Sequence, residues 1–319
     1  MRSQSTTTPR VLVQFVATFV VACAAVVLAC GSAARADTTL RWKFNKGEKT
    51  NYELKMDTTQ EMQLGGAPVQ IKATQTMDMT WEVVDVGADG TATMNQTIDR
   101  IRMEMTLPVP GQAPLKFDSK DENSAPGSEE MAKTFRAMVG QPFVLNVTPL
   151  GKVTDFKAPP GMLEQLKNSP MKEASAMFSE EGLKQLLGQI MMQLPAEAVS
   201  VGKTWDNTAE IKNPQNGNMV TTTHYSFAGP EERNGKKLDK IDVTVDVKIE
   251  GAGEASQIKV KDNKGVGAVY WDNTAGRPVE STIDSKMTME MSILGNPTEQ
   301  LVTTKVVMKQ VPAAAAREL

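Results

Sequence analysis

Long runs of alternating apolar and polar residues constrain this fold more than any other feature of the chain. Between Ile241 and Ile249 every second residue is Ile or Val, and Asp, Thr or Lys lies between them. Residues 77–83, 101–107 and 279–293 repeat the pattern. Successive side chains of a strand point to opposite faces, so this period of two predicts strands with one dry and one wet face. Such strands are typical of antiparallel sheets.

The predicted strands are longer than the usual strand of about five or six residues. Long strands coil, so we expect a strongly curved sheet or a half-barrel. Turn sequences separate the strands. Asp89-Gly90 and Asn234-Gly235 are typical of tight hairpins because these residues tolerate positive φ. A third, longer turn is predicted over 272–276.

The centre of the chain has a helical pattern instead. Ser179 is a suitable N-cap, Pro195 follows the last apolar position, and the spacing between them predicts a helix over 179–194. Its apolar stripe consists of Leu183, Leu186, Leu187, Ile190, Met191 and Leu194, and we expect this stripe to pack on the sheet. A weaker helix is predicted over 128–139 and a short one over 159–168.

These patterns together predict an α+β fold, in which a large curved antiparallel β-sheet packs against a few central helices. We expect one domain over 37–311, β-rich at 38–157 and 198–311 and helical at 159–197. Both β-rich parts open on a glycine followed by an aromatic strand entry, and the sequence leaves open whether they are a duplication. The Ala-rich tail, 312–319, is expected to be disordered.

The first 36 residues have the layout of an export signal. Arg2 and Arg10 precede an apolar run over 11–29, and Ala34-Arg35-Ala36 is a small-x-small cleavage motif. Cleavage there would release a periplasmic or extracellular protein that begins at Asp37. Residues 27–30 form an alternative lipobox, in which Cys30 would be lipidated and would anchor the protein to a membrane.

Composition argues against several functions. Removal of residues 1–36, with their three arginines, changes the net charge from −3 to −6, and no basic run remains to bind nucleic acid or an anionic membrane. Both cysteines, Cys23 and Cys30, lie in the leader, so the mature chain has no thiolate for catalysis or for zinc.

His224, the single histidine, is interpreted as a surface residue of a strand, with a general base as the alternative. We expect no cofactor and no enzyme activity, although a carboxylate-only hydrolase stays open.

Methionine is the one unusual candidate for function. The chain has 20 methionines, and three predicted strands carry Met-x-Met, which places each set on one face. The predicted ligand contacts are Met77, Met79, Trp81, Met103, Met105, Met287, Met289 and Met291. We expect an exported, non-enzymatic envelope protein that binds an apolar small molecule or an envelope partner on this adaptable surface. A structural or assembly module with a closed core is the alternative, and a thioether Cu(I) site is a third.

Several segments resemble an uncharacterised family of exported bacterial proteins that is classed as a domain of unknown function. They are Leu-Arg-Trp-Lys-Phe-Asn-Lys-Gly-Glu at 40–48, Pro-Leu-Gly-Lys-Val at 149–153, Met-Gln-Leu-Pro at 192–195 and Val-Gly-Lys-Thr-Trp at 201–205. The likeness covers most of 38–311 and implies no activity, cofactor or catalytic residue. More loosely, the layout is similar to periplasmic lipoprotein carriers, which is a likeness of fold only.

Overall fold

A computed structural model describes residues 37–64, 67–108, 111, 113–121, 129–163, 180–211, 218–250, 258–293 and 296–312. The chain divides into two units, Met1–Asp37 and Thr38–Leu319, and every element below belongs to the second. The predicted export signal, its cleavage motif and Cys30 lie outside the described residues, as do 313–319 of the predicted tail.

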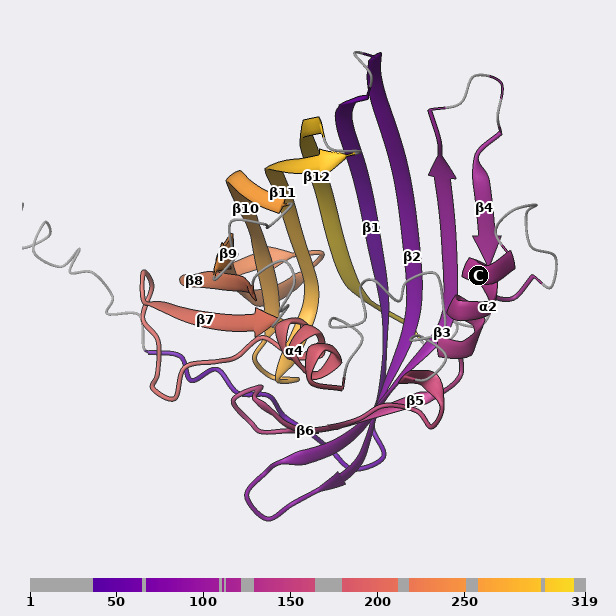
Figure 1. The fold of residues 1–319 in the computed structure, drawn as a ribbon. Coiled ribbons are helices and arrows are strands. Elements are labelled where there is room, and N and C mark those ends of the chain that lie inside the picture. The colour runs from indigo at the N-terminus through magenta and orange to yellow at the C-terminus, as the bar shows by residue number, and fades with distance from the viewer. Residues whose placement is uncertain are drawn as a thin grey trace, which may run out of the picture. The chain divides into compact units, whose positions relative to one another are not determined.

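Twelve strands form one antiparallel sheet in the described part of the chain, as the alternation predicts (Figure 1). In chain order they are β1 (Lys49–Leu64), β2 (Ala67–Val86), β3 (Ala92–Thr106), β4 (Leu115–Asp118), β5 (Pro142–Val147), β6 (Val153–Lys157), β7 (Thr204–Ile211), β8 (Asn218–Arg233), β9 (Lys236–Glu250), β10 (Ile258–Asp272), β11 (Arg277–Ile293) and β12 (Asn296–Val311). Across the sheet the order is β6-β5-β3-β2-β1-β12-β11-β10-β9-β8-β7, and β4 pairs with β3. The first and last long strands, β1 and β12, therefore lie side by side in the middle of the sheet.

The predicted turns are confirmed. Gly90 lies in the turn between β2 and β3 and has a φ of 80°. Asn234 and Gly235 join β8 to β9 with φ values of 51° and 73°, and two consecutive positive φ angles are what a tight hairpin of this twist requires. The longer turn over 272–276 joins β10 to β11.

In the described residues the fold is mostly β rather than α+β, because only short helices accompany the twelve strands. Residues 164–168 of the short helix predicted over 159–168 lie outside the described residues. Helix α2 (Glu129–Met138) agrees with the prediction over 128–139. Helix α4 (Glu180–Ile190) ends before the predicted 194, because the chain leaves the helix and the Leu194 amide donates to the Leu150 carbonyl in the β5–β6 turn. Leu183 and Leu194 are buried as expected. Residues 164–179 and the side chains of Leu186, Leu187 and Ile190 lie outside the described residues.

The segment before β1, residues 38–48, ties the base of the sheet together, and we call it the N-terminal strap. Thr38 pairs with Val199 after α4. The Trp42 amide donates to the Pro149 carbonyl in the β5–β6 turn, and the Lys43 amide donates to the Gly276 carbonyl in the β10–β11 turn. The strap thus joins three segments that are far apart in the sequence.

Candidate functional site

Strand register defines the two faces of the sheet. Leu54 on β1 lies opposite Met308 on β12, which lies opposite Ser281 on β11. The same row continues to Val269 on β10 and Ile241 on β9. Because side chains alternate along each strand, one row fixes which residues share a face as far as the next register shift, and such shifts follow Phe227 on β8 and lie near both ends of β10. We call the face that contains this row the inner face and the opposite one the outer face.

At the base of the sheet, Asp239 on β9 and Arg277 on β11 follow the same alternation as the inner-face residues. In the rows from Ile241 and Ser281 toward Ile249 and Met289, the inner face carries no charged side chain in the described strands β8–β12 and β1, although charged residues make up 23% of the chain. Its members there are Met219, Thr221, Thr223, Tyr225, Phe227, Ile241, Val243, Val245, Val247, Ile249, Asn263, Gly265, Gly267, Val269, Ser281, Ile283, Ser285, Met287, Met289, Gln300, Val302, Thr304, Val306, Met308, Leu54, Met56, Thr58, Gln60 and Met62. The charges gather on the outer face, where Arg233 pairs with Glu280 and Lys305 with Asp284. Apolar surface is therefore concentrated on one side.

A cavity of about 450 Å³ lies against this inner face. Its lining comes from β8, β9, β10, β11, β12 and β1, with Met192 from the segment after α4. Gly265, Ser281 and Ser285 are small residues at inner-face positions of β10 and β11. Their short side chains leave space above the sheet at these positions. A Cβ on Gly265 would lie 2.9 Å from the Cβ of Val245, so even alanine requires a shift of β9. The hollow is thus formed by small side chains on neighbouring strands.

The polar groups of the cavity are uncharged. The Asn263 side chain bonds the amide and carbonyl of Val247, at 2.6 and 2.7 Å, and extends the β9–β10 pairing. Burial raises the pKa of Tyr225 to about 12, so its phenol is neutral at physiological pH. Lys264 and Lys286 also border the cavity, but alternation assigns their side chains to the outer face, beside their neighbours Gly265 and Ser285.

The predicted contact residues lie on the same face, but most of them lie away from the cavity. Met287 lines it. Met79 and Trp81 are buried in the main core, and Met103 is buried in a second cluster, where α2 packs near β3 and β4. Met287, like Met77, Met105 and Met289, is partly buried. Met77 and Met105 pack against the second cluster. The side chain of Met291 lies outside the described residues. Whether any of the eight contacts a ligand stays a prediction.

The three Met-x-Met pairs do not share one site. Met77 on β2 and Met287 on β11 are separated by three strand spacings, which is about 14 Å at the usual spacing within a sheet. Within the described residues, no group of three or more His, Cys, Asp or Glu side chains is arranged to hold a metal ion.

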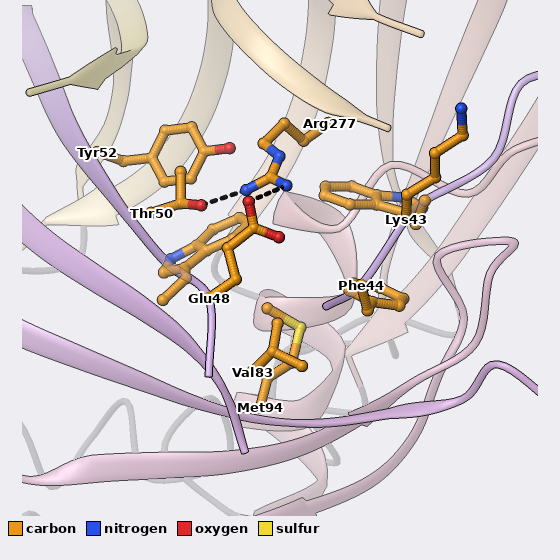
Figure 2. A pocket seen from close by; sticks show the side chains of 10 residues that line it. Lys43, Phe44, Glu48, Thr50, Tyr52, Val83, Met94 and Arg277 are labelled. Atoms are coloured by element: carbon orange, nitrogen blue, oxygen red, sulfur yellow. Dashed lines mark hydrogen bonds and ion pairs between the residues drawn. The ribbon is translucent and has the colours of Figure 1, made fainter. Parts of the chain in front are cut away.

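A second, much smaller pocket of about 20 Å³ lies at the base of the sheet. Figure 2 shows Arg277 between Thr50 and Glu48, and its guanidinium is 2.6 Å from the Glu48 carboxylate. The space is enough for about one water molecule. The buried indole N–H of Trp81 has no partner in the described residues and lines this pocket. The pocket therefore suits an ordered water rather than an organic ligand.

His224 is an exposed strand residue, as predicted, but it has two partners that the sequence did not indicate. On the outer face, its Nδ1 lies 2.8 Å from Asp206 on β7 and its Nε2 lies 3.2 Å from Asp246 on β9. The hydrogen bond with Asp206 is the largest cause that raises the pKa of His224. The two carboxylates hold the imidazole on the face opposite to the cavity.

The fold and the cavity together define an open antiparallel sheet with a hollow on one face, and the side chains that point into this hollow are uncharged. The chain belongs to a family of unknown function, DUF6263, whose model matches residues 89–305. This agrees with the resemblance to an uncharacterised family. No curated protein matches the sequence. No helix of the described residues is long and apolar enough to cross a membrane.

Solved structures are similar only at a low level. Lipovitellin, in a structure of its lipid–protein interactions, has a TM-score of 0.49 and 10% identity over 85% of this chain, which spans only 26% of that chain. DynF from the dynemicin biosynthesis pathway of Micromonospora chersina has a TM-score of 0.23, with 6% identity over 89% of this chain and 90% of its own. A domain from Vibrio parahaemolyticus assigned to outer membrane lipoprotein sorting has a TM-score of 0.13, with 10% identity over 83% and 89%. At TM-scores below 0.5, these likenesses say nothing about what this chain binds.

Proposed function

We propose that this protein is a non-enzymatic binding protein that holds an apolar molecule in the cavity on the inner face. The observation that carries the proposal is the cavity itself. Its volume of about 450 Å³ falls within the range of about 300–1,000 Å³ that is usual for small-molecule sites. A hollow whose inward-facing side chains are uncharged and mostly apolar favours a ligand whose transfer out of water is favourable.

The arrangement of titratable groups supports a binding role rather than catalysis. Burial raises the pKa values of two carboxylates, Asp99 and Asp239, but neither lines the cavity. The residue with a shifted pKa that does line it, Tyr225, is held neutral. A carboxylate pair that could act on a bound molecule is therefore missing from the described lining.

A dye-binding assay tests this function. Nile red is neutral and fluoresces in apolar surroundings, so it should bind the wild-type protein and be displaced by long-chain molecules. Ser285→Phe places a ring in the cavity and should abolish the signal, because Ser285 lines it. Thr282→Phe introduces the same ring on the outer face of the same strand and should leave binding unchanged. Equal dye binding by both variants would contradict a ligand in this cavity and favour a structural module with a closed core.

Export belongs to the same proposal. Three features support it: the basic start, the apolar run and the cleavage motif before Asp37. Intact-mass measurement of protein from its native envelope should give a chain that begins at Asp37. A diacylglyceryl mass on a chain that begins at Cys30 would instead show anchoring to a membrane.

A further inference from the structure

We infer that the cavity takes a neutral amphiphile, in which an alkyl chain is joined to an uncharged hydroxyl or ester group. The inference rests on the proposed function and names the chemical class of its ligand. It follows from the charge of the inner face, the hydroxyl groups at one end of the cavity and the length of the cavity along β11.

The inward-facing side chains of the cavity offer no partner to a charged head group. They are uncharged, and Lys264 and Lys286 belong to the outer face. A carboxylate, phosphate or ammonium group placed here would lose its water without meeting an opposite charge. Such desolvation is unfavourable unless the charge is paired. The cavity therefore selects against ions and accepts neutral molecules.

Hydroxyl groups lie mainly toward the Met287 end of the cavity. Thr221, Thr223 and Ser285 occupy the two rows there. Thr221 is only 9% exposed, and it lines the cavity. A ligand oxygen that bonds its hydroxyl would replace a hydrogen bond to water. Toward the base of the sheet the lining is apolar apart from Ser281 and the phenol of Tyr225, with Leu54 and Met308 side by side. The cavity thus has a polar end and an apolar end.

The cavity is also long for its volume. Its lining follows β11 from Pro278 to Met287, which spans at most about 30 Å at the usual rise of a strand. The lining also crosses six neighbouring strands, from β8 to β1, so a volume of about 450 Å³ spread over this area is shallow. A flexible alkyl chain can lie along such a shallow hollow.

Three probes with the same chain length test the head group: 1-monolauroylglycerol, laurate and dodecyltrimethylammonium, each below its critical micelle concentration at pH 8. Displacement of Nile red from the full mature chain gives their relative affinities. We expect the neutral probe to bind at least about tenfold more tightly than either ion. A charged probe that binds as tightly as the neutral one overturns this inference and leaves the proposed function intact. If neither Nile red nor any probe binds, both are wrong.

A pair of isosteric variants tests the role of Thr221. Thr221→Val removes the inward hydroxyl and should weaken 1-monolauroylglycerol about three- to tenfold, since one hydrogen bond is lost. The affinity for laurate should not change. Thr222→Val is the matched control on the outer face of β8, where Thr222 lies 3.3 Å from the hydroxyl of Thr208, and it should bind like wild type. Unchanged affinity of Thr221→Val for the neutral probe would refute the assigned head-group position.

Discussion

Replacement of Trp42 tests whether the N-terminal strap holds the base of the sheet together. Trp42 is 4% exposed, and its indole Nε1 donates to the buried Met192 carbonyl at 2.9 Å. Its ring meets that of Trp271 edge-on, with centroids 4.9 Å apart. The residue therefore contributes both packing and a hydrogen bond to a main-chain oxygen that water does not reach.

The magnitude follows from these contacts. Truncation of a buried Trp to Ala costs about 3–5 kcal/mol, including the cavity that remains. The carbonyl left without a partner adds about 1–3 kcal/mol. Contributions from one site are not additive, so we expect Trp42→Ala to lower the free energy of unfolding by about 4–6 kcal/mol. Because a domain is stable by only about 5–15 kcal/mol, this variant should be close to unfolding.

The conservative variant separates the hydrogen bond from the packing. Trp42→Phe keeps most of the ring and should cost about 1–3 kcal/mol, chiefly through the unpaired carbonyl. Trp205→Phe is the matched control. Trp205 Nε1 also donates to a carbonyl after α4, that of Gln193 at 2.9 Å, but its side chain is only partly buried. Water can replace that bond, so the cost should be below about 1 kcal/mol.

Urea denaturation followed by far-ultraviolet circular dichroism gives the three free energies, with the mature chain from Asp37 as reference. If the wild-type protein and the variants have the same dependence of unfolding free energy on urea concentration, unfolding remains two-state in all of them. Two results would refute the inference that Trp42 anchors the strap in the core. One is a loss of unfolding free energy below about 2 kcal/mol for Trp42→Ala, and the other is an equal loss for the two Phe variants.

Three further predictions concern stability. Gly267→Ala should lower the melting temperature, with a cost of about 1–3 kcal/mol, because a Cβ there would collide with the Thr282 carbonyl and lie 2.9 Å from the Cα of Ile283; a wild-type melting temperature would contradict this. His224 has a raised pKa in the folded protein, so its stabilisation is complete below the unfolded value of about 6.5 and is lost as pH rises through the folded value. His224→Gln should therefore flatten the fall in the urea midpoint above pH 6.5, and an unchanged pH profile would rule out the two carboxylate contacts. Arg277→Met should destabilise by about 2–4 kcal/mol, since it removes the charged partner of the partly buried Glu48 and leaves that carboxylate, in the described part of the chain, only its bond from Asn45; adding Glu48→Gln should restore part of the loss in a double-mutant cycle, and simple additivity would exclude the pair.

The sequence predicted the strands of the sheet better than the helices. Alternation along 241–249 and 279–293 identified β9 and β11, and Asn234-Gly235 identified the turn that joins β8 to β9. These signals are local, because side-chain alternation and positive φ are properties of a few adjacent residues. The end of α4 was missed because a distant contact decides it. The Leu194 amide bonds the β5–β6 turn, and nothing near Pro195 in the sequence encodes that partner.

The candidate site shows the same division between local and distant information. Side-chain alternation placed the methionines of each strand on one face of that strand, but it could not say whether Met77, Met103 and Met287 share a face or where the space lies. The hollow exists because Gly265 on β10 lies directly opposite Ser285 on β11, and Ser285 lies opposite Thr304 on β12. Small residues at alternate positions, such as Gly265-x-Gly267 within a long strand pattern, were the available signal.

The pairing register of the strands decides whether the small inner-face residues lie next to one another and form one cavity. A shift of one residue between β10 and β11 would bring Gly265 opposite Lys286 or Asp284 and would turn charged side chains toward the inner face. The Asn263 side chain opposes such a shift, because it bonds both main-chain groups of Val247 and fixes β10 against β9. The Lys43 amide, bonded to the Gly276 carbonyl, fixes the turn at the other end of β10. The uncharged cavity therefore depends on contacts at both ends of this strand, and one of them comes from the strap that begins just after the predicted cleavage site.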